Sequence, residues 1–243
     1  MMTGRDAARY VAPTSNLETV LFKNGGVDDI VDVILYADKL SKSFTKDLAP
    51  QLKGASDMET LRNLFYVVNN NIRYVRDRVG NEVVKSPGKF WKDRKGDCKS
   101  YSIFIGSVLK NLGYKYKYRV AFYDPKEPEK GHIYPIVVLP GGKQVVMDAI
   151  PLNDYTRHRA FNQEVPYWKA YDYAPSRSAT TALAGFEDAE PTKSRLQKIL
   201  DSFKTDEFWV GVAQRTAQGV IVWIGVEILK TLVEKRRTRR RTA

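Results

Sequence analysis

Cysteine is nearly absent from this sequence: Cys98 is the single one among 243 residues. One cysteine cannot form a disulfide within the chain, so the fold does not depend on an oxidising compartment. Histidine is also scarce, with two residues. Because zinc sites draw mainly on cysteine and histidine, a zinc site is not expected, and no metal ion or other cofactor is predicted.

Long apolar runs are missing as well. The most apolar stretch, 216–226, is shorter than the ~20 residues that a membrane-spanning helix needs. The first residues lack the apolar segment of a secretory signal. These absences favour a cytoplasmic location over a secreted or membrane-spanning one.

Acidic residues are outnumbered, with 28 Asp and Glu against 40 Lys and Arg, for a net charge of +12. Part of the excess lies at the C-terminus, in Lys235, Arg236, Arg237, Arg239, Arg240 and Arg241. Such a run can contact nucleic acid or an anionic membrane. The alternative is a solvated tail without a partner.

Composition divides the chain into five parts. Residues 1–26 form an N-terminal extension that ends in two glycines, and 27–175 form the core domain. Small polar residues indicate a linker over 176–192. A helical segment over 193–234 and a basic tail over 235–243 follow. The helical segment is predicted to pack on the body or on a partner chain, or else to lie on a membrane surface.

Three helices are predicted in the core from apolar residues at helical spacing. They cover 28–44, 57–72 and 98–112, with Asp57 as the N-cap of the second and Gly113 after the third.

Strands are predicted where apolar and polar residues alternate, over 114–122, 132–139 and 144–150, and a hairpin turn over 140–143 joins the last two. Residues 151–168 are irregular and rich in aromatic side chains. Helices followed by a short antiparallel sheet indicate the α+β class.

Cys98 is the strongest candidate for a functional residue because it opens a predicted helix. The helix dipole and the free N–H groups of a first helical turn stabilise a thiolate. A lone cysteine is otherwise more often a small buried apolar residue, so its neighbours decide the interpretation.

His132 and Asp148 lie on the two strands joined by the predicted hairpin. Counting from the turn places His132 opposite Met147 or Asp148, and side chains on paired strands lie about 5 Å apart. An imidazole held by a carboxylate can take the proton of a nearby thiol. The pattern therefore predicts a Cys98, His132 and Asp148 triad.

An oxyanion formed during acyl transfer needs hydrogen-bond donors. The backbone N–H of Cys98 is one, and the second donor is expected among Trp91, Tyr74 and Asn71. The other histidine, His158, lies between two arginines and is interpreted as a surface residue.

The segment from Asp57 to Ile150 resembles the transglutaminase-like superfamily of cysteine enzymes. The matching motifs are Ile72-Arg73-Tyr74-Val75, Ser86-Pro87, Gly96-Asp97-Cys98, Leu109-Lys110-Asn111-Leu112-Gly113, Gly131-His132-Ile133-Tyr134 and Val146-Met147-Asp148. The resemblance implies a papain-like or transglutaminase-like core in which Cys98 is the nucleophile, His132 the base and Asp148 its orienting partner. The His-x-Tyr and Ser-Pro motifs resemble small members encoded by phages and prophages.

Three positions depart from the family pattern. Lys99-Ser100 follow the cysteine where many relatives have acidic residues, Tyr134 stands where many have tryptophan, and Ala149 replaces the usual proline. These differences concern the substrate more than the triad.

The sequence therefore predicts a cysteine hydrolase, a peptidase or amidase, or an acyl-transfer enzyme acting on a peptide or protein. Hydrolysis is favoured over cross-linking, since cross-linking enzymes are usually much larger. The alternative is a non-catalytic structural protein of a virion or other assembly, attached through 193–234 and the basic tail to a partner, a membrane or nucleic acid. The expected location is the host cytoplasm or the virion.

Overall fold

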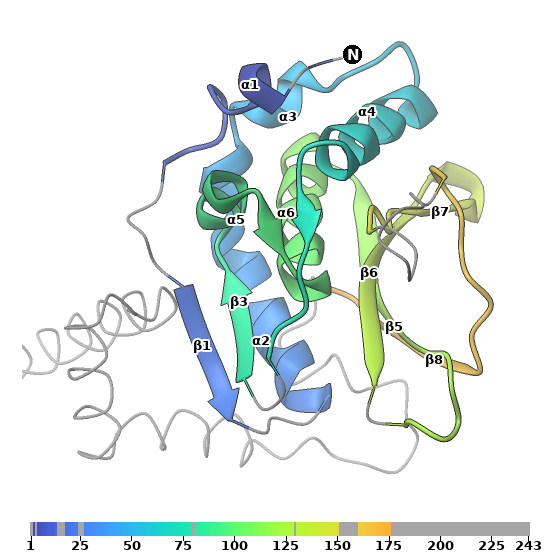
Figure 1. Ribbon diagram of the computed structural model, residues 1–243. Coiled ribbons are helices and arrows are strands. Elements are labelled where there is room, and N and C mark those ends of the chain that lie inside the picture. Colours follow the sequence, from blue (N-terminus) through green and yellow to red (C-terminus); the bar gives the residue numbers. More distant parts are fainter. Residues whose placement is uncertain are drawn as a thin grey trace, which may run out of the picture.

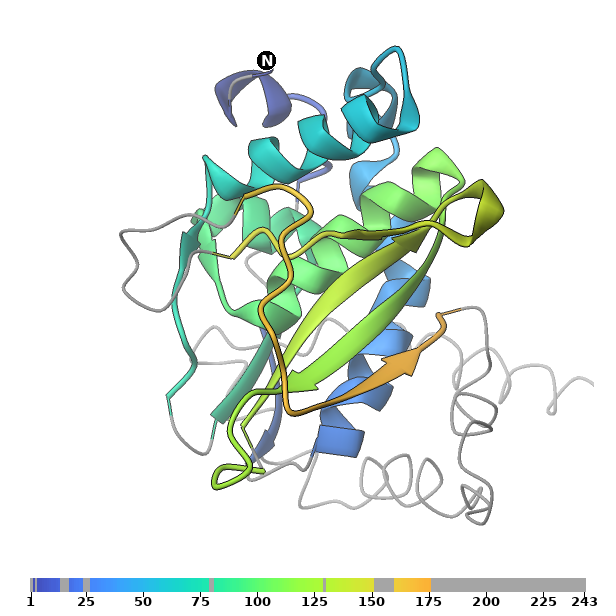
Figure 2. The same cartoon turned by 90° about the vertical axis from the view of Figure 1, so that its right-hand side faces the viewer.

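The computed structural model describes residues 2, 4–13, 18–23, 27–78, 81–128, 130–150 and 160–175. The predicted linker, C-terminal helical segment, basic tail and His158 lie outside these residues. A layer of helices packs against one face of an antiparallel sheet (Figures 1 and 2). No helix in the described ranges has both the length and the apolar character needed to cross a bilayer.

Helix α6, Cys98–Leu112, is the centre of the fold. Asp97 caps its N-terminus, where the carboxylate accepts a hydrogen bond from the N–H of Ser100 at 3.2 Å. Gly113 ends the helix at φ 81°, a left-handed conformation that suits glycine. Because 99–109 are all buried, the helix is enclosed by other elements on every side.

The helices around α6 supply one half of the core. They are α2 (Val27–Leu40), α4 (Asp57–Asn69) and α5 (Pro87–Asp93). Shorter helical turns are α1 (Gly4–Ala7), η1 (Ser41–Thr45), α3 (Leu48–Gln51) and η2 (Pro140–Gly142). The N-cap of α4 is Ser56 rather than the predicted Asp57, because the Ser56 hydroxyl accepts from the N–H of Glu59.

The main sheet has the strand order β7-β6-β5-β8, and all its pairs are antiparallel. Its strands are β5 (Lys115–Phe122), β6 (Gly131–Val138), β7 (Gln144–Val146) and β8 (Lys169–Tyr173). α6 covers its inner face, and the segment that leads into β8 crosses its outer face (Figure 2). β8 lies beyond the three predicted strands.

Two small strand pairs complete the described fold. β1 (Glu18–Lys23) is antiparallel to β3 (Asn81–Lys85), and β2 (Arg73–Tyr74) is parallel to β4 (Lys95–Gly96). β4 lies directly before the start of α6, with the capping residue Asp97 between them.

β7 ends at Val146, four residues earlier than predicted. The N–H of Met147 still donates to the carbonyl of Pro135 at 3.0 Å. Proline has no N–H, so the second hydrogen bond of this residue pair cannot form and the ladder stops. Asp148 therefore lies just past the strand instead of within it.

Candidate functional site

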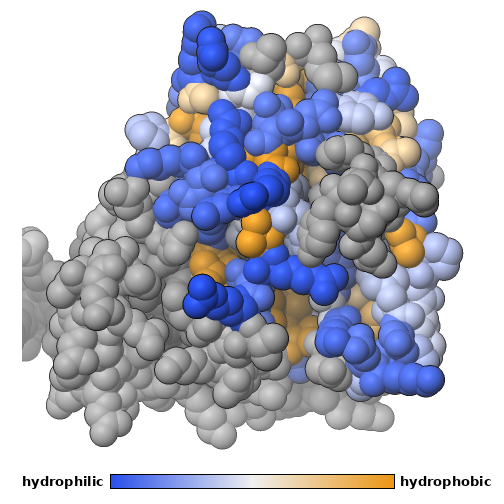
Figure 3. All heavy atoms as spheres, in the orientation of Figure 1, coloured by the Kyte–Doolittle hydropathy of each residue, from blue (hydrophilic) through white to orange (hydrophobic). Residues whose placement is uncertain are grey.

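A cleft of about 530 Å³ opens beside the N-terminus of α6. Its walls come from the start of α2, the β2 to β3 segment, the first residues of α6 and the facing ends of β5 and β6. Cys98 and His132 both line it. Hydrophilic side chains surround apolar patches on this face (Figure 3).

Cys98 is the first residue of α6 and is half-buried, so its sulfur can be reached from the cleft. The N–H groups of the first helical turn have no acceptor within the helix. Together with the helix dipole, they favour a negative charge on the sulfur or on an oxygen beside it.

His132 contacts Asp148 and lines the same cleft as Cys98. Its Nε2 lies 2.8 Å from Oδ2 of Asp148, whose residue is 1% exposed. Burial lowers the pKa of His132, but the Asp148 charge and hydrogen bond outweigh it, and a hydrogen bond with Cys98 raises the pKa further, to about 9. Since Nε2 faces Asp148, Nδ1 is the nitrogen left for the sulfur. Because its pKa is about 9, the imidazole is a cation at neutral pH.

Two amide side chains hold the segment that carries Asp148. Asn162 Oδ1 accepts from the N–H of Val146 at 2.8 Å, and Asn69 Nδ2 donates to the carbonyl of Ala149 at 3.0 Å. These bonds continue the support that β7 loses at Pro135. They also make Asn69 and Asn162 part of the site, although neither has a recognisable sequence signal.

The three oxyanion candidates lie in different surroundings. Tyr74 lines the cleft with Cys98. Burial, and then the nearby Cys98 and Asp97, raise the pKa of Tyr74, so its hydroxyl keeps its proton and can donate it. Tyr74 is therefore the candidate with access to the sulfur.

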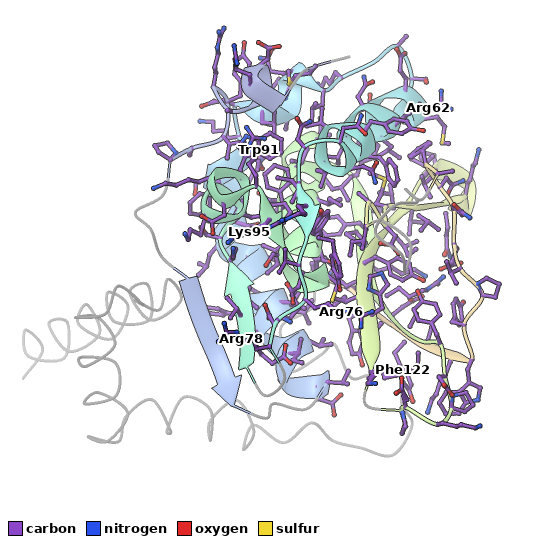
Figure 4. The ribbon with its side chains drawn as sticks, viewed as in Figure 1. Arg62, Arg76, Arg78, Trp91, Lys95 and Phe122 are labelled. Carbon is purple, nitrogen blue, oxygen red and sulfur yellow. The ribbon has the colours of Figure 1, made fainter. Side chains whose placement is uncertain are left out.

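Trp91 and Asn71 are not among the residues that line the cleft. The Trp91 ring stacks on Phe104 in the core, with ring centres 5.2 Å apart, and lies beneath Arg94. Figure 4 shows Trp91 beside α5, well apart from Arg76 at the cleft. The Asn71 amide donates to the carbonyl of Val67 at 2.8 Å.

Lys99 forms an ion-pair cluster that the sequence pattern did not reveal. The residue is 6% exposed, and its Nζ pairs with Asp97, with Asp77 at 3.1 Å and with Glu82 at 2.6 Å. The bonds tie the start of α6 to the β2 to β3 wall of the cleft. The partners Asp77 and Glu82 lie too far from Lys99 in the sequence for any local motif to indicate them.

The carboxylates around Lys99 affect the pKa of Asp97, and their spacing suits a cation. Burial raises the pKa of Asp97 to about 6, with Lys99 opposing the shift and Asp77 adding to it. Ligand oxygens of Asp77, Glu82 and Asp97 lie within 4.8 Å of one another, a spacing that suits a cation. The ammonium of Lys99 fills that role.

Residues 46–149 match the family described as the Transglutaminase-like superfamily. The match covers somewhat less than half of the 243 residues and includes Cys98, His132 and Asp148. This part of the chain has a transglutaminase-like, papain-like fold of mixed helix and sheet, and the predicted α+β class is confirmed.

One solved structure shows similarity to the chain: a crystal structure described as "a Putative Cysteine Protease" from Cytophaga hutchinsonii, with 18% sequence identity and a TM-score of 0.37. The similarity covers 56% of this chain and 51% of that protein, so the chain spans about half the length of this relative. None of the curated proteins compared with the chain matches it.

Proposed function

We propose that this protein is a cysteine hydrolase that cleaves an amide bond of a peptide or protein through a covalent thioester. The observation that carries the proposal is the position of His132. Nε2 of its ring lies 2.8 Å from Oδ2 of Asp148, and the ring lines the same cleft as Cys98, which raises the pKa of the imidazole. The transglutaminase-like family match over 46–149 supports the same chemistry.

The first step forms the acyl-enzyme. The Cys98 thiolate attacks the carbonyl carbon of the amide, and the C=O electron pair moves to oxygen. When the tetrahedral species collapses, the C–N bond breaks and the leaving amine takes the proton held on His132. Asp148 keeps the ring oriented and stabilises its charged form before this transfer.

The second step releases the acyl group. His132, now neutral, takes a proton from a water molecule as the water oxygen attacks the thioester carbon. The C–S bond breaks, the carboxylic acid leaves and the Cys98 thiolate returns with a protonated His132. An amine in place of water would give acyl transfer, and we favour water as the acceptor.

The oxyanion of both steps would lie between two donors. One is the backbone N–H of Cys98 at the start of α6, and the other is the Tyr74 hydroxyl in the same cleft. Since the pKa of Tyr74 is raised, the hydroxyl stays protonated in the working pH range.

The test replaces the nucleophile. Cys98→Ala should lower hydrolysis of peptide and cell-wall peptide substrates by at least about 10⁴-fold, because the thioester cannot form. Intact-mass spectrometry with a peptide thioester should show an acyl adduct on the native protein and none on the variant. Unchanged hydrolysis by a folded Cys98→Ala protein would reject the proposal.

A phage or prophage association is suggested by the Ser86-Pro87 and His132-Ile133-Tyr134 motifs, which resemble those of phage and prophage members of the family. On that resemblance we propose an enzyme made in an infected or lysogenic host, and residues 193–234 with the basic tail as its attachment to a virion component, a membrane or nucleic acid. Presence of the chain in purified particles is the check, and a chain found only in the free host fraction would contradict it.

A further inference from the structure

The walls of the cleft carry more negative than positive charge, although the chain as a whole has a net charge of +12. Apart from His132 of the candidate site itself, the basic lining residues are Arg76, Lys99 and Lys130. The acidic lining residues are Asp77, Glu82, Asp97, Asp124 and Glu127. The described lining therefore opposes the charge of the rest of the molecule.

The wall next to Cys98 holds one of the two excess negative charges. Three carboxylates of this wall contact the single ammonium of Lys99, and Arg76 is the second cation there, so one negative charge remains in excess. The side chains of Asp77 and Glu82 are 21% and 27% exposed. A carboxylate has room for about four hydrogen bonds, so both can accept a donor from a bound molecule while they hold Lys99.

This wall is also well fixed. Asp77 accepts a further hydrogen bond from the N–H of Val83 at 2.7 Å, and Lys99 is anchored at the first turn of α6. Lys99 acts as a positioning residue, since it holds two carboxylates from the β2 to β3 segment beside the nucleophile. Charges fixed in advance attract a ligand without a cost for ordering them.

The opposite wall, which carries Asp124, Glu127 and Lys130, also has a net negative charge. Glu127 pairs with Lys130, and Asp124 accepts from the N–H of Lys126 at 2.8 Å, so one carboxylate there exceeds the local ammonium. A molecule that reaches Cys98 passes between two walls that each favour a cation.

We propose that the cleft selects acyl donors that carry an ammonium or guanidinium group next to the scissile bond, with Asp77 and Glu82 as the specificity-determining residues. The reaction itself rests on the proposed function, whereas the charge preference of the cleft can be measured without any turnover.

The measurement uses two thiol reagents of equal reactivity type and opposite charge. Methanethiosulfonates bearing a trimethylammonioethyl or a sulfonatoethyl group both transfer their thioalkyl group to a thiolate and release methanesulfinate. Cys98 is the single cysteine, so intact mass reports its modification alone. Any change in the ionised fraction of the thiol cancels in the ratio of the two rates.

The ratio of cationic to anionic rates, divided by the same ratio for free cysteine, should exceed one and decline as salt is added. Asp77→Asn and Glu82→Gln should each lower it about fourfold, since a charge about 8 Å away changes each rate about twofold in opposite directions. Each variant leaves two carboxylates for Lys99. Asp47→Asn, an exposed change outside the cleft, should leave the ratio unaltered.

A normalised ratio at or below one overturns the inference, and so does a ratio that the Asp77 and Glu82 variants leave unchanged. In the peptide assay, kcat/KM for a donor with lysine beside the scissile bond should exceed that for its glutamate counterpart. If no peptide is cleaved but the ratio behaves as expected, the proposed reaction fails and the cation preference stands. If peptides are cleaved without preference for lysine, the preference fails alone.

Discussion

Two buried carboxylates lie near opposite ends of α6 and differ in what surrounds them. Asp38 on α2 is fully buried and accepts from the hydroxyls of Tyr116 at 2.6 Å and Tyr118 at 2.7 Å, and it pairs with Lys110 near the C-terminus of the helix. Asp148 is nearly as buried, and it bonds His132 at the cleft.

The difference lies in the donors. Burial, and then Asp38, raise the pKa of both tyrosines, so these two donors keep their protons. The partner of Asp148 is a ring whose pKa is about 9 and which lines the cleft with Cys98. A buried carboxylate therefore indicates a candidate reaction site when its hydrogen-bond partner can exchange a proton with a group that lines a cleft.

The largest expected effect is on turnover in Asp148→Asn. An amide cannot stabilise a charged His132, so the rate should fall by about 10⁴-fold. The fold should survive, because the imidazole can lose its proton and remain hydrogen-bonded to the amide. Peptide hydrolysis and thermal unfolding measured on one preparation check both parts.

A loss of unfolding free energy in Asp148→Asn equal to that in Asp38→Asn would remove the distinction between the two carboxylates. The matched variant at Asp38 is thus the control for the first prediction.

Asp38→Asn should mainly lower the free energy of unfolding, by about 2–3 kcal/mol. This is less than the roughly 3–5 kcal/mol lost on breaking a fully buried pair, because the Lys110 side chain is 25% exposed and can turn to water. Urea unfolding gives the loss. Activity per folded molecule, counted by alkylation of Cys98, should change less than twofold, and a hundredfold drop would mean that the cluster serves the cleft.

The smallest effect concerns pH. Since the pKa of His132 is raised to about 9, its proton is available to the leaving amine at neutral pH and is lost above that value. We expect kcat/KM to fall about tenfold one pH unit above 9. The stability that the charged ring contributes is complete below pH 6.5 and disappears as the pH rises through about 9.

A pH profile of kcat/KM on a neutral peptide checks this fall in rate above pH 9. Asp148→Asn should move the fall in kcat/KM to lower pH, because the Asp148 carboxylate raises the pKa of the ring. If kcat/KM of the variant falls at the same pH as that of the native protein, the titration belongs to a group other than His132.

Local patterns were enough to predict α6, with Cys98 at its start and Gly113 at its end, because caps and apolar spacing act within one turn of a helix. The hairpin of β6 and β7 was also predictable, and it brings His132 to Asp148 although the ladder stops early at Pro135. Near the start of α4, Ser56 and Asp57 are both good capping residues, and only the backbone geometry decides between them.

Contacts between distant segments were not predictable. The pairing of β1 with β3, the Lys99 cluster and the Asp38 cluster each join residues that no periodicity connects. Among the oxyanion candidates, all three are common donor types, and their access to the cleft depends on packing around Phe104 and Val67. Composition describes a side chain, whereas tertiary packing decides which space it faces.

The early end of β7 has a consequence for how this site can be tuned. Besides the backbone hydrogen bond of Met147 to Pro135, the main chain around Asp148 is held by two amide side chains, from Asn162 at Val146 and from Asn69 at Ala149. A paired strand shifts only in steps of a residue, but a segment held partly by side chains can be adjusted by fractions of an ångström through substitutions outside Cys98, His132 and Asp148. Evolution could in this way alter the basicity of the ring without touching the residue that holds it.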